Sequence, residues 1–218
     1  MKTYQDFNKD QVIENKINVT CIGAFDGLHR GHIELIKKTK KIDNNFQIVT
    51  FNEIPKIYFD NNLKPLLDKE KRDSIFEEYK PTNLIYLKFN EINKYSSDEF
   101  LKFLDINLNT NKIVVGKDFK FGKNRTGDVN NIINYFGEDN VILLSDYLID
   151  NDKVSSTKIR KYLDTGNIQQ ANKFLGRKYE IAGTVVEGLK MGSKLGIPTA
   201  NLKLHHDLYL PKFGVYDI

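Results

Sequence analysis

The sequence predicts an α/β fold, namely a doubly wound and mostly parallel sheet followed by the start of a small β-barrel domain. Three observations carry this prediction. Short apolar segments alternate with helical segments over residues 1–150, which is typical of βαβ units. A glycine-rich turn links the first strongly apolar segment to a helix. After residue 179 the helical segments stop, and β-type segments and glycines take their place.

Five strands are expected in the first part of the chain, because each segment is short, apolar and rich in Val, Ile or Phe. They lie at residues 17–25, 46–51, 83–89, 112–116 and 141–145. Helices are expected between and after these strands, from apolar residues at helical spacing and from capping residues such as Asp68. They lie at residues 33–41, 68–80, 97–104, 128–136, 158–165 and 167–175, and Gly166 and Gly176 stop the last two.

The change of pattern predicts a domain boundary between residues 165 and 180. Residues 1–165 are expected to form the α/β domain, residues 166–178 a helical linker, and residues 179–218 an incomplete β domain. A unit of about 40 residues is marginal as a separate fold. The strands expected in it lie at residues 179–188, 199–204 and 213–218.

The composition excludes several classes of protein. Hydrophobic residues make up 40% and charged residues 28%, as in a globular protein, and no apolar run approaches the roughly 18 residues of a membrane span. The N-terminal segment has no apolar core of a secretory signal. The single cysteine, Cys21, cannot form an intrachain disulfide and lies inside an apolar strand. These features predict a cytoplasmic protein without a membrane partner.

The basic residues point to individual sites rather than to a charged surface. The net charge is only +4, and the scattered lysines are interpreted as solvated surface, so no nucleic-acid partner is expected. Arginine is scarce, and each one is therefore a candidate for a role that needs its planar fork of donors. The five are Arg30, Arg72, Arg125, Arg160 and Arg177. The oligomeric state stays open.

Residues 23–32, GAFDGLHRGH, carry the strongest chemical signal. Gly27 and Gly31 let the backbone approach a ligand closely. The helix that begins near His29 directs unpaired N–H groups and the positive end of its dipole to this point, which predicts an anion site. His29 and His32 are three residues apart, so they share one helix face and suit phosphate oxygens that gain charge in a transition state. A zinc site is the weaker alternative, because no third histidine accompanies them.

This segment resembles the HxGH signature of the nucleotidyltransferase superfamily. Its longer form, G-x-F-D-G-x-H-x-G-H, resembles the FAD synthetase module of bacterial bifunctional riboflavin kinase/FAD synthetases. Residues 115–128 resemble the G-x-D/N-F-x-F-G loop of that family, and residues 154–160 resemble its S-S-T-x-I-R motif. The resemblance implies a nucleotidyltransferase-like fold and the transfer of an adenylyl group from ATP to FMN, giving FAD and pyrophosphate.

The resemblance also implies roles for single residues. The catalytic residues would be His29, His32 and Arg160, with Arg160 as a phosphate clamp one turn into its helix. ATP would contact Gly23, Phe25, Asp26, Gly27, Gly31, Ser156 and Thr157, and the flavin would contact Asp118, Phe119, Phe121 and Arg125. Mg²⁺ is expected to arrive with ATP. From the residues alone, Ser156 and Thr157 could instead cap a helix just before it begins, and Phe119 and Phe121 could instead be core aromatics.

Residues 183–201 resemble the start of the riboflavin kinase module, with a glycine-rich loop and the sequence P-T-A-N. The positions that would contact Mg-ATP there are Gly188, Gly192, Gly196, Thr199 and Asn201. The catalytic carboxylate of that module normally follows further on, so this chain is expected to use ATP and FMN as substrates but not to phosphorylate riboflavin. Ile54 stands where the family usually has a histidine before Pro55.

Two other functions stay open at this point. One is another HxGH transferase with a different phosphate acceptor, which the 116–128 loop and the P-T-A-N sequence disfavour. The other is a flavin- or nucleotide-binding module without catalysis, for which Ile54 leaves room.

Overall fold

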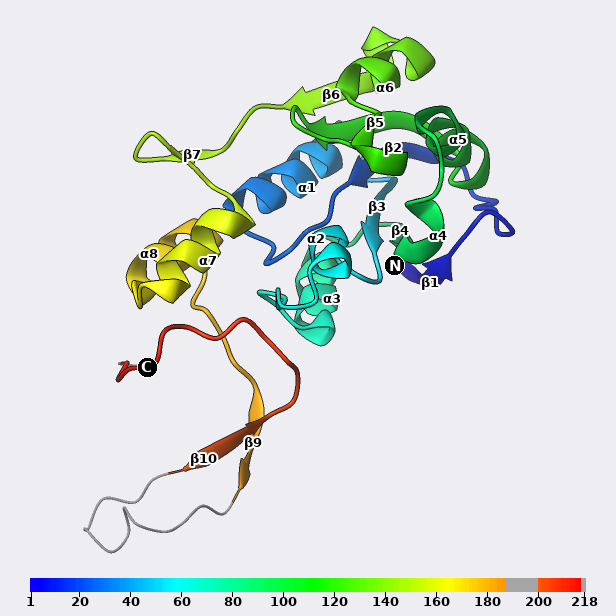
Figure 1. Ribbon diagram of the computed structural model, residues 1–218. Coiled ribbons are helices and arrows are strands. Elements are labelled where there is room, and N and C mark those ends of the chain that lie inside the picture. The colour runs from blue at the N-terminus through cyan, green and yellow to red at the C-terminus, as the bar shows by residue number, and fades with distance from the viewer. Residues whose placement is uncertain (187–199, 217–218) are drawn as a thin grey trace, which may run out of the picture.

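The computed structural model describes residues 1–186 and 200–216. Six strands form one fully parallel sheet in the order β1-β4-β3-β2-β5-β6 (Figure 1). They are β1 (Lys2–Phe7), β2 (Ile17–Ile22), β3 (Phe46–Phe51), β4 (Asn83–Leu87), β5 (Thr110–Gly116) and β6 (Val141–Leu144). The predicted α/β class is confirmed. The sequence analysis misses β1 because this edge strand is mostly exposed and polar, and only its pairing with β4 identifies it.

Helices cover both faces of the sheet, as a doubly wound fold requires. On one face, α1 (Arg30–Ile42) and α3 (Lys69–Glu78) pack on alternate side chains of the strands, among them Cys21 and Tyr86. On the other face lie α4 (Phe89–Ile92), α5 (Ser97–Lys102) and α6 (Val129–Phe136). Local sequence fixes several helix starts: Asp68 accepts a hydrogen bond from the Lys71 N–H at 2.7 Å, and Ser96 and Asp128 form capping boxes.

The remaining short elements connect these layers. They are α2 (Pro55–Phe59), a π-helical turn (Phe103–Asn107), 3₁₀ turns (Lys123–Arg125 and Glu138–Asn140) and a small hairpin of β7 (Leu148–Ile149) and β8 (Asp152–Lys153). Within the described ranges, no helix is long and apolar enough to cross a membrane.

The strand order places the site. The chain runs from β2 to β3 and β4 on one side of the sheet, and then returns to β5 on the other side of β2. The connections after β2 and after β5 therefore diverge at the carboxyl ends of these two strands. Such a topological switch point is where open α/β sheets bind ligands.

The C-terminal elements lie beyond the carboxyl ends of the strands. Helices α7 (Ser156–Asp164) and α8 (Ile168–Leu175) share an apolar cluster with Leu66 and Val154. Strands β9 (Gly183–Val186) and β10 (Asn201–Leu204) form an antiparallel hairpin that projects away from the sheet, and the chain then runs back beside α7 (Figure 1). The strand expected at 213–218 is wrong over its described part, since residues 213–216 pair with no strand.

Candidate active site

The turn after β2 has an unusual backbone. Phe25, Gly27 and Leu28 have positive φ angles of 51°, 77° and 40°. For a residue with a side chain, this conformation costs about 1–3 kcal/mol and persists only where the surroundings impose it. Both Phe25 and Leu28 are fully buried, which anchors the turn. The Arg177 guanidinium adds two hydrogen bonds, to the Leu28 carbonyl at 2.9 Å and to the Gly27 carbonyl at 2.6 Å.

The two imidazoles lie together at the start of α1. His29 is the N-cap of this helix, and its Nδ1 accepts a hydrogen bond from the His32 N–H at 3.3 Å. The rings stack with centroids 3.6 Å apart and an interplanar angle of 13°. A neutral imidazole that accepts at Nδ1 carries its proton on Nε2, so His29 offers an Nε2–H donor. The rings of Phe25 and His32 pack edge to face with their centroids 5.4 Å apart. Because Phe25 is fully buried, this contact packs the His32 imidazole against the core.

Burial controls the charge of this pair. It lowers the pKa of His29 to about 4, and it holds the pKa of His32 well below the ordinary 6.5. The neighbouring His29 ring and then the Arg177 cation act on the pKa of His32 in the same direction. Both rings are therefore neutral near pH 7, and a neutral imidazole can donate one hydrogen bond but carries no positive charge. Positive potential at the site comes from the first N–H groups of α1 and from nearby Lys and Arg.

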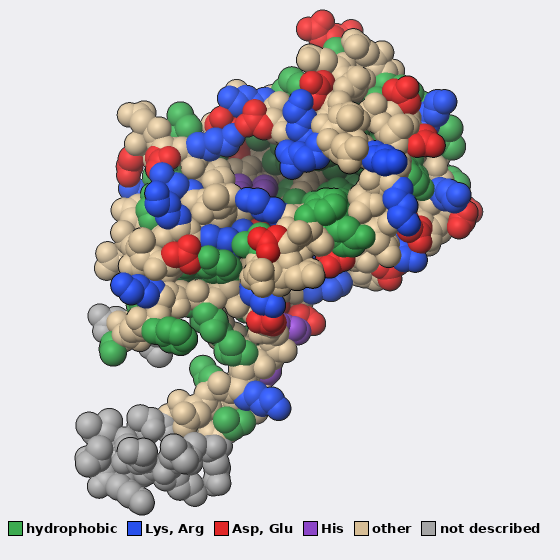
Figure 2. Space-filling view, viewed as in Figure 1, with side chains coloured by type: hydrophobic (Ala, Val, Ile, Leu, Met, Phe, Trp, Pro, Cys, Tyr) green, Lys and Arg blue, Asp and Glu red, His purple; other side chains and the backbone are tan. Residues whose placement is uncertain are grey.

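The surface at this point is hollowed. Figure 2 shows histidine side chains at the bottom of a hollow whose rim carries Lys and Arg side chains. His32 Nδ1 is buried and has no hydrogen-bond partner among the described residues. Buried polar atoms are ordinarily hydrogen-bonded, so this nitrogen suits a polar ligand.

The S-S-T-x-I-R motif of residues 154–160 meets the glycine-rich turn of residues 23–32 at the carboxyl ends of the strands. Ser156 Oγ donates a hydrogen bond to the Asp26 carbonyl at 2.7 Å, and Lys56 Nζ donates to Thr157 Oγ1 at 2.9 Å. The predicted helix start needs a correction, because the N-cap of α7 is Ser155, whose side chain accepts from the Lys158 N–H at 3.2 Å. Ser156 and Thr157 are thus the first helical residues, and their hydroxyls are free of the capping role.

Arg160 and Asp26 form a buried ion pair that joins the two motifs. Arg160 Nη1 lies 2.7 Å from Asp26 Oδ2, and both side chains are 6% exposed. Arg160 Nη2 donates to the Lys64 carbonyl at 2.7 Å, and Asp26 Oδ1 accepts from the Leu66 N–H at 3.3 Å. The sequence predicts Arg160 as a phosphate clamp and Asp26 as an ATP contact, but here each is the other's partner. Arg160 Nε is buried without a hydrogen-bond partner among the described residues, so part of the guanidinium keeps donor capacity.

The predicted flavin loop divides into core and surface residues. Phe121 is 6% exposed and packs on Phe100 with ring centroids 5.2 Å apart, so it belongs to the core. Phe119 stacks on Phe121 at 5.7 Å and is half-buried. Asp118 is exposed and pairs with Lys153. Flavin contact by Asp118, Phe119 and the exposed Arg125 stays a prediction, whereas Phe121 holds the loop on the core.

The remaining predicted positions contribute less to this site. The predicted kinase positions Gly188, Gly192, Gly196 and Thr199 lie outside the described residues. Asn201 is exposed and pairs with Val186 at the start of β10. Ile54 is buried and precedes α2 without a side-chain cap. Burial raises the pKa of the Cys21 thiol to about 12, which excludes a reactive thiolate there.

The glycines of the first motif fit their predicted role as backbone positions. At Gly27, with its positive φ, a Cβ would lie 3.0 Å from the Leu66 side chain. At Gly31 it would lie 3.4 Å from the His29 ring, and at Gly23 it would lie 3.1 Å from the Phe25 ring. A side chain at any of these three positions would press against Leu66, the His29 ring or the Phe25 ring, so glycine allows the close packing of the turn.

Sequence reasoning misses two residues of the site. Lys56 follows Pro55 in α2 and reaches α7, but nothing in its local sequence indicates this. Arg177 lies far along the chain from the turn whose carbonyls it binds. The scarcity of arginine is the signal that could have identified it, because Arg177 is one of only five.

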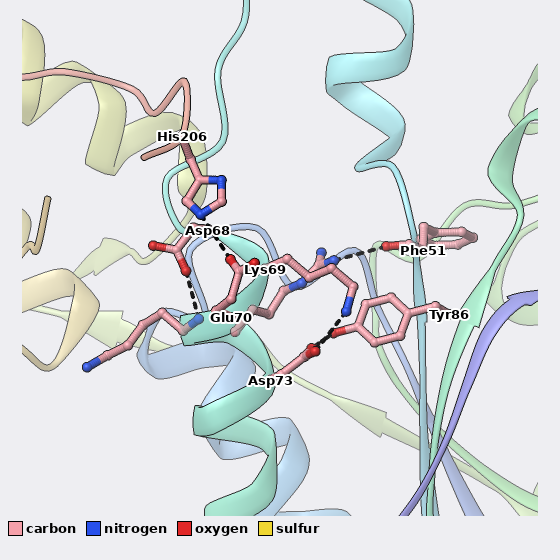
Figure 3. A network of polar contacts seen from close by, with 9 residues as sticks. Phe51, Asp68, Lys69, Glu70, Asp73, Tyr86 and His206 are labelled. Carbon is pink, nitrogen blue, oxygen red and sulfur yellow. Dashed lines mark hydrogen bonds and ion pairs between the residues drawn. The ribbon is translucent and has the colours of Figure 1, made fainter. Parts of the chain in front are cut away.

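A separate polar network lies on the α3 side of the molecule (Figure 3). Tyr86 donates a hydrogen bond to Asp73, and Arg72 donates to the Phe51 carbonyl at 3.3 Å. His206 belongs to the segment after β10, and its Nε2 lies 3.1 Å from Glu70 Oε2. This network attaches the returning C-terminal segment to α3.

The fold and the site together define the nucleotidyltransferase class of α/β proteins: a parallel doubly wound sheet with paired imidazoles at a helix N-terminus beyond its central strand. A family model described as FAD synthetase matches residues 11–158, and one described as riboflavin kinase matches residues 175–218. The chain belongs to the FAD synthetase family.

Curated relatives agree with this assignment. The bifunctional riboflavin kinase/FMN adenylyltransferase of Buchnera aphidicola subsp. Schizaphis graminum is 36% identical over 215 residues, which cover 94% of this chain and 69% of the relative. The protein of the same name from Listeria monocytogenes is 32% identical over 212 residues, covering 92% and 67%. The chain thus spans about two thirds of the length of these relatives.

Solved structures share the fold. A crystal structure from Streptococcus pneumoniae, described as a macrolide-efflux protein, has a TM-score of 0.87 and 30% identity, and covers 99% of this chain and 73% of that one. Pantothenate synthetase from Thermus thermophilus has a TM-score of 0.51 at 12% identity, covering 81% and 72%, and supports the α/β nucleotidyltransferase-like fold alone.

Proposed function

We propose that this protein transfers the adenylyl group of ATP to FMN, producing FAD and pyrophosphate. The observation that carries the proposal is the pair of stacked, neutral imidazoles at the N-terminus of α1, at the switch point of the sheet. The family match over residues 11–158 and the names of the relatives support this reaction.

The chemistry follows from what the residues offer. The FMN phosphate is already anionic, so it can attack the α-phosphorus of ATP in line, and the bond to the pyrophosphate oxygen breaks without a covalent enzyme intermediate. The protein then has to position the two substrates and stabilise the charge that grows on the phosphate oxygens. His29 Nε2–H, His32 and the N–H groups of α1 are the donors for this role. The first N–H groups of α7, together with Lys56, face the same edge from the other motif.

Arg160 acts in this scheme through Asp26. The ion pair fixes the turn after β2 against α7, so the donors of both helices converge on one point. We keep Gly23, Gly27 and Gly31 as backbone positions along the nucleotide, and Asp118, Phe119 and Arg125 as flavin contacts.

Mg²⁺ is proposed as the ion that ATP brings with it. Among the described residues, no cluster of three or more His, Cys, Asp or Glu side chains could hold a metal ion. Magnesium commonly binds through substrate phosphates and water, with few protein ligands. In this role it would neutralise phosphate charge, while the residues named above orient the substrates.

We also propose the domain division given by the sequence, with the adenylyl-transfer domain at residues 1–165, a helical linker at 166–178, and a riboflavin kinase-like β segment at 179–218. The separate two-stranded sheet of β9 and β10 supports the β segment of this division. The relatives are named as kinases as well as adenylyltransferases, and the assay below measures both activities.

The test is a turnover assay in which FMN or riboflavin is supplied separately with Mg-ATP and the flavins are separated by chromatography. We expect FAD from FMN, with release of pyrophosphate. Binding of ATP without binding or consumption of FMN would indicate a transferase with another phosphate acceptor. Binding of ATP and FMN without any product would favour a non-catalytic binding module.

A further inference from the structure

The segment after α8 packs against the catalytic turn. Arg30 Nε donates a hydrogen bond to the Lys173 carbonyl at 2.9 Å. Gly176 has a φ of 84°, and a Cβ at this position would lie 2.9 Å from Arg30 Cγ, so only glycine allows this approach. Arg177 follows directly and binds the carbonyls of Gly27 and Leu28. The turn that leads into His29 is therefore held by residues about 150 positions later in the chain.

The geometry requires an arginine. The two carbonyls belong to neighbouring residues with positive φ, and they point to one guanidinium, whose two Nη groups each donate to one of them. A planar fork of fixed donors matches a pair of acceptors in this way, whereas the ammonium of lysine is a point charge. His29 follows Leu28 directly and caps α1, so a shift of these carbonyls moves the imidazole pair.

We propose that Arg177 is a positioning residue for adenylyl transfer, which acts by fixing the turn before His29 and so the orientation of both imidazoles. This inference rests on the proposed function. Arg177 lies within the riboflavin kinase match at residues 175–218 and outside the FAD synthetase match at residues 11–158. The adenylyl site is therefore completed by a residue outside the FAD synthetase match.

Arg177 has a second, electrostatic effect on the same pair. Its cation faces the two imidazoles and contributes to their lowered pKa values, after burial and, for His32, after the His29 ring. Glu180, Tyr179 and Glu78 are the charged and titratable groups that act on Arg177 itself, and they favour its charged form. Loss of the cation therefore raises the pKa of the imidazoles, whereas loss of the fork alone does not.

Two variants separate the two effects. Arg177→Lys keeps the charge but loses the fork, and Arg177→Gln loses the charge. Lys178→Gln is the matched control, since it removes one charge from the exposed neighbouring residue. We expect both Arg177 variants to lower kcat by about ten- to a hundredfold, the range for small misplacement of catalytic groups, with KM for ATP changed less than about threefold. The control keeps wild-type kinetics.

NMR titration of the imidazoles supplies a readout that needs no turnover. The titration midpoint of His29 should rise in Arg177→Gln and stay unchanged in Arg177→Lys and Lys178→Gln. Urea unfolding of each variant separates these effects from loss of folded protein. Wild-type kcat in both Arg177 variants, or a kcat loss matched by the unfolded fraction, would overturn the proposal. If the wild-type protein forms no FAD, the proposed function fails, but the titration still tests whether Arg177 acts on the imidazoles.

Discussion

Replacement of His29 tests the site most directly, because this residue combines a structural and a catalytic role. Nδ1 caps α1 by accepting from the His32 N–H, and Nε2–H is left as a donor. His29→Ala removes both functions. His29→Asn keeps an N-cap acceptor, since asparagine is among the best N-cap residues, but removes the imidazole donor. The two variants therefore separate folding from catalysis.

The structure sets the expected magnitudes. The cap hydrogen bond of 3.3 Å is long, so its loss in His29→Ala should cost about 0.5–1 kcal/mol of unfolding free energy, the lower part of the N-cap range. Loss of a donor to developing charge typically lowers kcat by about 10²–10³, equivalent to about 2.7–4 kcal/mol. We expect this kcat loss in both variants, with ATP affinity changed much less. His29→Asn should retain most of the wild-type stability.

The assay is the initial rate of FAD formation from FMN and Mg-ATP, with ATP binding measured by calorimetry and stability measured by urea unfolding. His205→Asn is the control, because this exposed histidine contacts Thr184 on the distant hairpin. A His29→Asn variant with kcat within a few-fold of wild type would refute the assignment of His29 as a transition-state donor. A loss confined to KM would show that His29 only binds substrate.

Three further predictions concern the surrounding structure. Arg160→Lys should lower kcat/KM by about tenfold or more and the unfolding free energy by about 1–3 kcal/mol, because an ammonium cannot replace the buried contacts of the guanidinium with Asp26 and a backbone carbonyl. Wild-type kinetics in this variant would show that a point charge suffices. The contribution of His29 to stability should fall by about 3 kcal/mol between pH 6.5 and 4, since the unfolded chain binds a proton on His29 in this window while the folded protein, with a pKa of about 4, does not, and the lowered pKa of His32 adds a loss of the same sign. Urea unfolding should show a flatter pH profile in His29→Asn than in the wild type, and identical profiles would contradict the buried neutral imidazole. Gly27→Ala should destabilise the protein by about 1–3 kcal/mol, because the φ angle of Gly27 is 77° and the new Cβ would lie only 3.0 Å from the Leu66 side chain. An unchanged thermal midpoint in this variant would argue against the turn geometry.

The class of fold follows from local sequence patterns alone, and so does the expected position of an anion site at the start of α1. Alternation of apolar strands with helices is a local pattern, and so are the capping residues and the glycines at turns, which is why strands β2 to β6 and the main helices are correctly predicted. The pairing of His29 with His32 on one helix face follows from their spacing alone. The edge strand β1 escapes this reasoning, because its residues are mostly exposed and only a partner strand defines it.

The way in which the motifs meet, and the charge and contacts of their side chains, depend on the three-dimensional fold. Spacing cannot show that Arg160 pairs with Asp26, that Phe121 is core while Phe119 is half-buried, or that Arg177 binds the turn before His29. Each of these contacts joins residues that are distant in sequence or depends on which side of a loop faces the core. The charge of the imidazoles belongs to the same category, because it is set by burial against Phe25 and the neighbouring ring, and burial exists only after the chain has folded.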